Sequence, residues 1–442
     1  DQPATSVTSA TSTTSTTSTT STATGGGGAS GTTGVSQGGG GAGGTTTTAT
    51  SAGAGGDLDA GGPPPTEEDA GGFQPSDDWI FSDQTIHTVE ITLPPASVSA
   101  LDASPFEFAQ GDFVFDGMQV PKVGVRLRGK IGSFRTLAGK PKFKIEFGEI
   151  VKDQRFYGLD TLSLNNEVVD CSYLKEPLAY RVFALAGVPS ERTGFARVSV
   201  NGADYGLYVI VETPDSRWLK RSYPEPKGNL YDGKYVWFGG NNYQLLDFAN
   251  GVDDMFQLEE GMDVGHADIQ AISSAVSASY GTAQFGATVA PLLDWAEYHR
   301  ELAAEQWVGH NDGYALNTNN YRVYFNPADG KAQIVPWDFD YGFLHDSDWG
   351  MSWASPLGRL AHGCFLDPQC AADHKVAVKA LIDAIDPAAL LAWFDQIDAL
   401  TFAETQDDPR RECGAGEVGA WRDYLRGFIT NQNAALTVFW GL

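Results

Sequence analysis

Residues 306–345 read QWVGHNDGYALNTNNYRVYFNPADGKAQIVPWDFDYGFLH, and this stretch decides the fold. Apolar and polar residues alternate from Tyr321 to Phe325, which predicts a strand, and the turn formers N-P-A-D-G follow at 326–330. A second apolar run at 332–335 predicts another strand. Two strands joined by such a turn are expected to pair as a β-hairpin. The residues before the first strand then come close to those after the second.

Side chains with hard oxygen donors lie at both ends of this predicted hairpin. Asp312 and Asn320 precede its first strand, and Asp338 and Asp340 follow its second strand. Carboxylate and amide oxygens suit Mg²⁺ or Mn²⁺ far better than zinc. Clustered carboxylates raise one another's pKa unless a cation is present. A divalent metal site at this rim is therefore the economical explanation of the cluster.

The motif N-D-G-Y…N-N-Y-x-x-Y…P-W-D-F-D in this stretch resembles the CotH kinase family, named after a spore-coat protein. Protein kinases carry an Asp and an Asn on a catalytic loop, then a β-hairpin, then a metal-binding Asp. The resemblance implies that Asp312 orients the substrate hydroxyl or accepts its proton. It implies that Asp338 binds the metal ion on the phosphates of ATP and that Asn320 holds a second metal or the loop. Asp340 would be a further ligand.

Residues 123–147 resemble the part of the same family that covers the nucleotide phosphates, R-x-R-G-N-S…K-K-x-Y-x-I-x-F. Two strands are predicted, at 123–129 and 142–147, with a Gly/Ser turn between them. The resemblance implies that Gly129 and Ser133 form a phosphate-covering loop. A strand lysine would pair the phosphates, and the register leaves three candidates: Lys142, which we favour, and its competitors Lys140 and Lys144.

Two further segments match the family. The helix motif L-K-E-x-L-A-Y begins a helix predicted at 171–186 with Asp170 as its N-cap, and the resemblance implies that Glu176 pairs with the strand lysine. The hairpin predicted at 196–212 is similar to the family's R-V-x-V-N-G-x-Y-x-G-L-Y-x-x-V-E. Its second strand would lead into a hinge, where the backbone around Glu212 meets the adenine.

A strand-rich first half and a helical second half predict an α+β fold. The resemblance implies a two-lobed, atypical protein-kinase-like domain over residues 73–442. Its strand-rich N-terminal lobe would span about 84–212 and its helical C-terminal lobe about 213–442. Residues 1–72 consist largely of Thr, Ser, Gly and Ala without an aromatic residue, so they cannot bury enough apolar surface to fold. We expect a disordered spacer there.

The net charge of the chain is −27. Six of the acids lie in residues 1–72, which contain no Lys or Arg, so the remaining residues carry −21. This charge argues against nucleic acid or an anionic membrane as a partner but not against ATP with a metal ion. No apolar run reaches the roughly 18 residues of a membrane span. The sequence does not predict an oligomeric state.

The spacer resembles the stalks of exported bacterial surface proteins and lipoproteins. Because no Met begins the chain, we expect a mature form from which an export signal was removed, located at the cell surface or outside the cell. A disulfide could close the short loop between Cys364 and Cys370, although Cys413 competes for either partner. Cys171 is expected to be a buried free thiol at the start of a helix.

The predicted function is that of an exported CotH-type kinase, which transfers the γ-phosphoryl group of Mg- or Mn-ATP to Ser or Thr of surface or secreted proteins. One alternative is a non-catalytic binding or structural module on the same fold. Another is a carbohydrate-active protein, which 12% aromatic residues and many acids would suit. The kinase-like spacing of the acids disfavours the carbohydrate alternative. No P-loop, G-x-S-x-G or H-E-x-x-H motif is present.

Overall fold

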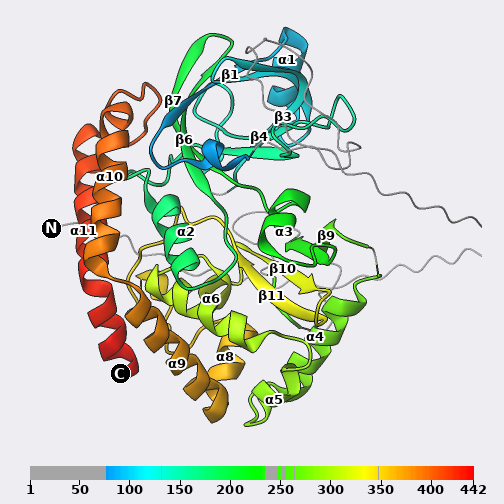
Figure 1. Cartoon of the computed structure of the whole chain (residues 1–442), viewed down its shortest axis with the longest axis vertical. Helices are drawn as coiled ribbons and strands as arrows, with labels where there is room; N and C mark the ends of the chain where they lie inside the picture. Colours follow the sequence, from blue (N-terminus) through cyan, green and yellow to red (C-terminus); the bar gives the residue numbers. More distant parts are fainter. Residues whose placement is uncertain (1–75, 131, 234–245, 250–254, 263, 347) are drawn as a thin grey trace, which may run out of the picture. The chain divides into compact units, whose positions relative to one another are not determined.

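The computed structural model describes residues 76–130, 132–233, 246–249, 255–262, 264–346 and 348–442 (Figure 1). All of them belong to one compact unit, 62–442. The predicted spacer at 1–72 lies outside the described residues. The mixed α+β class is confirmed, because strands dominate the first half of the described chain and helices the second.

The strands of the first half close into a barrel in the order β1-β2-β3-β4-β5-β7-β6. Their bounds are β1 (Ile86–Thr92), β2 (Ala109–Phe115), β3 (Met118–Arg128), β4 (Lys142–Glu146), β5 (Thr161–Asn165), β6 (Thr193–Val200) and β7 (Ala203–Val211). The parallel pair β1–β6 closes the barrel, and its other neighbouring strands pair antiparallel. Alternate side chains such as Val89, Ile91 and Phe113 are buried in its interior, as strand periodicity requires. The short helix η1 (Asp78–Phe81) precedes β1, and the helix α1 (Pro95–Ala103) connects β1 to β2.

A second sheet has the strand order β11-β10-β8-β9, with β8 (Asn229–Gly233), β9 (Phe256–Glu260), β10 (Tyr321–Asn326) and β11 (Lys331–Pro336). The predicted hairpin is confirmed, because β10 and β11 pair antiparallel from Tyr321 opposite Pro336 to Asn326 opposite Lys331. This register puts the residues that precede β10 beside those that follow β11.

Helices surround this sheet and continue along one side of the barrel (Figure 1). They are α2 (Lys175–Leu185), α3 (Ser216–Ser222), α4 (Ala267–Ser279), α5 (Phe285–Val289), α6 (Trp295–Trp307), α7 (Tyr314–Asn317), η3 (Asp348–Gly350), α8 (Arg359–Leu366), α9 (Pro368–Ala384), α10 (Pro387–Gln406) and α11 (Ala415–Trp440). One apolar core joins α2 to β6, β7, α6 and the last three helices. None of the helices in the described ranges is both long and apolar enough to cross a membrane.

Helix α2 begins later than predicted. It starts at Lys175, because the Asp170 carboxylate accepts hydrogen bonds from the N–H groups of Ser172 and Lys175 and holds the intervening residues in a turn. Asp170 is therefore not an N-cap of α2. Leu185, the last residue of α2, is 39% exposed although it is apolar. The helix thus contributes a shorter apolar face than its sequence suggests.

The prediction for Cys171 is wrong. Cys171 forms a disulfide with Cys413, 242 residues later in the chain, whereas the predicted Cys364–Cys370 disulfide is confirmed. A bond between such distant residues depends on the whole fold, so local sequence does not reveal it.

Cys413 lies in a segment between α10 and α11, residues 407–414, which we call the C-terminal strap. The strap packs on the connection between β3 and β4. Lys140 Nζ donates a 2.6 Å bond to Asp408, and both side chains are buried. The Arg135 guanidinium donates two bonds of 2.5 Å to Glu412. The strap therefore ties the end of the chain to the barrel.

Candidate active site

A cavity of about 960 Å³ is lined by residues of β3, β4 and β5 of the barrel, of β8 and β10 of the second sheet, and of the loops beside them. Six of the predicted site residues line it: Gly129, Ser133, Asp312, Asn320, Asp338 and Asp340. The fold therefore brings together residues as far apart in the sequence as Gly129 and Asp340. Lys142, Glu176 and Glu212 are not among its lining residues.

Lys142 contacts both carboxylates that follow β11. Its Nζ lies 3.3 Å from an oxygen of Asp338 and 3.1 Å from an oxygen of Asp340. Burial alone lowers the pKa of Lys142, but the two carboxylates outweigh it and hold that pKa above its ordinary value. Burial and the neighbouring Asp338 raise the pKa of Asp340 to about 6. One lysine thus faces two carboxylates, the partly exposed Asp338 and the buried Asp340, and its single charge cannot offset both.

The two metal-ligand candidates at the ends of the hairpin share an unusual backbone conformation. Asn320 has a φ of 50° and Asp338 has a φ of 51°, in the left-handed region that costs energy for residues other than Gly. The N–H of Trp337 donates to the carbonyl of Asn320, and the His310 imidazole bonds the carbonyl of Asp338. These bonds hold the two ends of the hairpin against each other.

Asp312 sits at the centre of an amide cluster. One carboxylate oxygen accepts hydrogen bonds from Asn317 at 2.5 Å and Asn319 at 3.2 Å, and the other accepts one from Asn320 at 3.0 Å. Burial raises the pKa of Asp312 above its ordinary value despite these donors. A carboxylate offers about four lone-pair sites, so Asp312 retains one for a hydroxyl donor.

Glu305 supports this loop from α6. Its two carboxylate oxygens accept hydrogen bonds from the N–H groups of Tyr314 and Ala315, at the start of α7. This buried support fixes the short helix that follows Asp312. Sequence reasoning missed it, because a Glu within a helix carries no local sign of what it binds.

Glu176 does not form the predicted ion pair. Its carboxylate is buried and accepts two hydrogen bonds from the Asn165 amide, at 2.9 and 2.7 Å, while Lys142 pairs with Asp338 and Asp340. Burial and the charge of Asp338 raise the pKa of Glu176 to about 7. The two amide bonds from Asn165 hold the Glu176 carboxylate in place. Because the amide is uncharged, it does not neutralise the carboxylate.

The structure separates the three competing lysines. Lys140 is buried under the strap, where Asp408, Tyr173 and the carbonyl of Leu207 accept its hydrogen bonds. Lys144 lies 3.8 Å from Glu146 in the cavity wall. Only Lys142, of these three, contacts the carboxylates at the hairpin's exit.

The connection between β3 and β4 covers part of the cavity. Gly129 has a φ of 97°, and a Cβ atom there would lie 3.0 Å from Ser133 Oγ, so this turn requires glycine. Ser133 is buried, and its carbonyl accepts a bond from Asn166. Ile131, which the predicted phosphate loop includes, lies outside the described residues.

Glu212 follows β7, but its side chain is directed to two arginines. Arg192 and Arg221 each donate a 2.7 Å bond to its carboxylate, and its N–H donates to the carbonyl of Arg192. The Glu212 carboxylate is therefore occupied by these arginines, and contact of its backbone with the adenine stays a prediction. Thr213 and Asp215 line the cavity at this point instead.

The oxygen donors of Asp338, Asp340 and Asn320 fit a hard divalent cation. They meet in one cavity, two of them are carboxylates, and a single lysine is their nearest cation. Mg²⁺ and Mn²⁺ favour this donor chemistry, and no thiolate or imidazole joins the set among the described residues.

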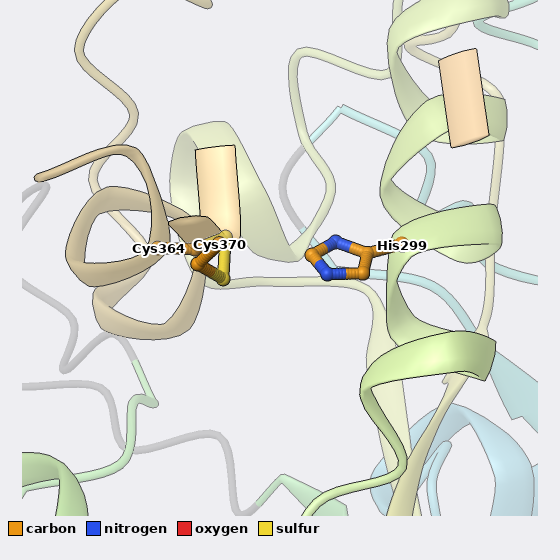
Figure 2. Close-up of side chains that lie close together, drawn as sticks. All are labelled: His299, Cys364 and Cys370. Atoms are coloured by element: carbon orange, nitrogen blue, oxygen red, sulfur yellow. A yellow bond between two sulfur atoms is a disulfide. The ribbon is translucent and has the colours of Figure 1, made fainter. Parts of the chain in front are cut away.

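A second group of possible metal ligands lies away from this cavity. Figure 2 shows His299 facing Cys364 and Cys370, and the two sulfur atoms are bonded to each other. Disulfide sulfur does not act as a thiolate ligand. Burial lowers the pKa of His299 to about 4, so this imidazole is neutral at physiological pH. The arrangement is that of an apolar core around a disulfide.

Comparison with known proteins yields one family match. A family model described as CotH kinase protein matches residues 125–377. The inner spore coat protein H of Bacillus subtilis (strain 168) is 25% identical over 208 residues, which cover 46% of the chain and 54% of that protein. The chain thus spans about half the length of this curated relative.

A solved structure also matches the chain. It is titled as the toxin–antitoxin system HipA and HipB of Shewanella oneidensis MR-1 in complex with operator DNA. The match has 13% sequence identity and a TM-score of 0.33 and covers 79% of this chain and 72% of the matched one. A score at this level supports no conclusion about fold or function.

Proposed function

The chain belongs to the CotH kinase family, and on this premise we propose that it transfers the γ-phosphoryl group of ATP to a hydroxyl group of a protein. The observation that carries the proposal is the cavity lined by Asp338 and Asp312, with the Nζ atom of Lys142 3.3 Å from an Asp338 oxygen. Phosphoryl transfer depends on positioning and charge neutralisation more than on covalent chemistry. Asp312 would position the acceptor, and Lys142 and a metal ion held by Asp338 would neutralise phosphate charge.

In this proposal the fold is a two-lobed, kinase-like one. The barrel corresponds to the N-terminal lobe, and the second sheet with the helices corresponds to the C-terminal lobe. The cavity has walls from both, which is where a kinase binds its nucleotide. Gly129 and Ser133 would cover the phosphates, and the backbone at Thr213 would lie near the base.

Each polar residue of the site then has a role. Asp338, Asp340 and Asn320 would hold Mg²⁺ or Mn²⁺, which neutralises phosphate charge when it is bound. Lys142 would exchange its carboxylate partners for phosphate oxygens.

Asp312 would accept a hydrogen bond from the acceptor hydroxyl and orient it for attack on the γ-phosphorus. Glu176 would serve as the anionic partner of Lys142 once the lysine leaves Asp338. The Asn165 amide holds it ready for that exchange.

The acceptor would be a Ser or Thr side chain of a surface or secreted protein. The similarity to a spore-coat protein supports a location at the bacterial surface or outside the cell. Two disulfides in the described chain support an oxidising compartment as well. The Thr- and Ser-rich residues 1–72 would act as a spacer to a lipid or wall anchor.

The test is transfer of label from γ-labelled ATP to casein, or to the protein itself, with Mg²⁺ or Mn²⁺. We expect transfer by the parent chain and its loss in Asp338→Ala and Asp312→Ala. Asp383→Ala, which removes an exposed carboxylate on α9, is the matched control and should retain activity. Absence of both transfer and ATP-dependent thermal stabilisation in the parent would support the non-catalytic alternative.

A further inference from the structure

Arg128, the second arginine of the R-x-R-G motif, is a cation in the cavity wall. It is the last residue of β3, and in the β3–β4 register it lies directly opposite Lys142. Arg126 lies opposite Lys144 in the same register. The side chains of Arg126 and Arg128 share one face of β3, because they are two residues apart, and both line the cavity. Three cations of these two strands, Arg126, Arg128 and Lys144, therefore line the cavity.

The guanidinium of Arg128 is held in place by uncharged groups. Its Nη1 donates a 2.8 Å bond to Ser163 Oγ, and its Cζ lies 5.2 Å from the centre of the Trp337 ring. Arg128 forms no ion pair with a carboxylate in the part of the chain that the structure describes. Burial lowers the pKa of this guanidinium to about 10, and Asp338 is the strongest of the acids that oppose the shift.

A cation that is partly removed from water and lacks a paired anion is costly, and such groups are rare in protein interiors. The cost is recovered when an anionic ligand fills the cavity. Guanidinium groups suit phosphate in particular, because their planar fork donates two parallel hydrogen bonds to its oxygens.

Arg126 provides a contrast on the same strand. Four acids surround it electrostatically, namely Glu259, Glu107, Glu146 and Asp232, and its guanidinium lies 5.3 Å from the centre of the Phe108 ring. Burial nevertheless lowers the pKa of Arg126. The two arginines differ in their surroundings, because the acid with the largest effect on Arg128 is Asp338, a metal-ligand candidate, whereas for Arg126 it is Glu259.

We propose that Arg128 binds a phosphate group of the nucleotide together with Lys142. This inference rests on the proposed kinase function and assigns the site an additional nucleotide-binding residue. Ser163 and Trp337 act as positioning residues for the guanidinium. A phosphate rather than the base is the ligand, because Arg128 lies across from Lys142, whose Nζ atom contacts Asp338 at the proposed metal-binding end of the cavity.

Calorimetric titration of the full chain with MgADP, adenosine and magnesium pyrophosphate tests the proposal. We expect Arg128→Gln to weaken binding of ADP and pyrophosphate by about 10- to 100-fold, the range for hydrogen bonds to charged groups. Adenosine should bind parent and variant equally. Arg181→Gln, which removes an exposed arginine of α2 outside the cavity, is the control and should bind ADP as the parent does. Titration with pyrophosphate shows whether phosphate groups bind at this site without the nucleoside.

Arg128→Lys is a second test, because it keeps the positive charge but loses the planar guanidinium that donates two parallel hydrogen bonds. We expect it to bind ADP less tightly than the parent with adenosine unchanged, and it decides the question if Arg128→Gln does not fold. Equal ADP affinity of the parent and a folded Arg128 variant would overturn the inference and leave the kinase proposal standing. A parent that binds none of the three ligands would overturn both.

Discussion

Lys142 and Asp338 are 196 residues apart in the sequence, yet the Nζ atom of Lys142 lies 3.3 Å from a carboxylate oxygen of Asp338. The contact joins β4 of the barrel to the turn after β11. In the absence of nucleotide it also stabilises the site, because it offsets the repulsion between Asp338 and the nearby Asp340. The same lysine thus has a structural role before it has a chemical one.

Removal of this lysine should destabilise the metal-free protein. Lys142→Met leaves the buried Asp340 and the partly exposed Asp338 without their cation, and breaking a buried pair costs about 3 kcal/mol. Added Mg²⁺ should recover part of the loss, because the metal replaces the missing charge. Thermal unfolding with and without Mg²⁺ measures the effect. Lys140→Met is the control, since its partner Asp408 lies under the strap and its loss should not be recovered by the metal.

Metal affinity should depend on pH near the pKa of Asp340, which burial and Asp338 raise to about 6. Below that pH a proton occupies the carboxylate, so Mn²⁺ must displace it, and affinity should fall by up to about tenfold per pH unit. Titration with Mn²⁺ between pH 5 and 8 measures this dependence. Asp340→Asn should bind more weakly but with a flatter profile. Constant affinity of the parent across this range would contradict the assignment.

Glu297 on α6 should make stability fall as pH rises. Burial, followed by the charge of Asp294, raises the pKa of Glu297 to about 8 from an ordinary 4.5. The folded state therefore keeps a proton that the unfolded state releases. The resulting stability is complete below pH 4.5 and is lost as pH rises through 8, by up to about 1.4 kcal/mol per pH unit.

Chemical denaturation of Glu297→Gln at several pH values checks this prediction. The neutral amide should flatten the decline, so that the variant gains on the parent most clearly near pH 8. Glu225→Gln, at an exposed position, should follow the parent curve. A Glu297→Gln profile as steep as that of the parent would show that another group causes the decline.

The two disulfides should contribute unequally to stability. In the chain-entropy description a cross-link that spans 242 residues is worth about 5 kcal/mol, and one that spans 6 residues about 2 kcal/mol. Replacement of Cys171 and Cys413 by Ala should therefore lower the unfolding temperature more than the same change at Cys364 and Cys370. Equal losses would indicate that the strap is held by its ion pairs rather than by its disulfide.

The β10–β11 hairpin could be predicted from sequence because its information is local. Alternation from Tyr321 and the turn at 326–330 determine the pairing, and the pairing brings Asn320 and Asp338 together. The alternating pattern of β4 likewise identified a strand. Its register left three lysines open, since the burial of Lys140 depends on Asp408, which lies 268 residues away.

Other features had no local signal. Glu176 contacts Asn165 rather than Lys142 because of the relative position of α2 and the barrel. The helix α2 begins late because Asp170 forms a turn. The R-x-R-G motif contains Arg128 but does not give its role, because an arginine in an alternating strand has the same local appearance whether it meets solvent, a carboxylate or a cavity. The role of such an arginine depends on charged residues far away in the sequence, and the periodicity of a strand carries no information about them.

The C-terminal strap has a consequence for how the protein is made. A ribosome releases residues 135–171 long before residues 408–413, so Lys140, Arg135 and Cys171 must wait for most of the described chain before they meet their partners. Contacts of such high sequence separation slow folding and leave intermediates exposed to aggregation. We therefore expect the barrel to mature after synthesis rather than during it. In a chain that ends after α10, the barrel would lack its ion pairs and its disulfide with the strap.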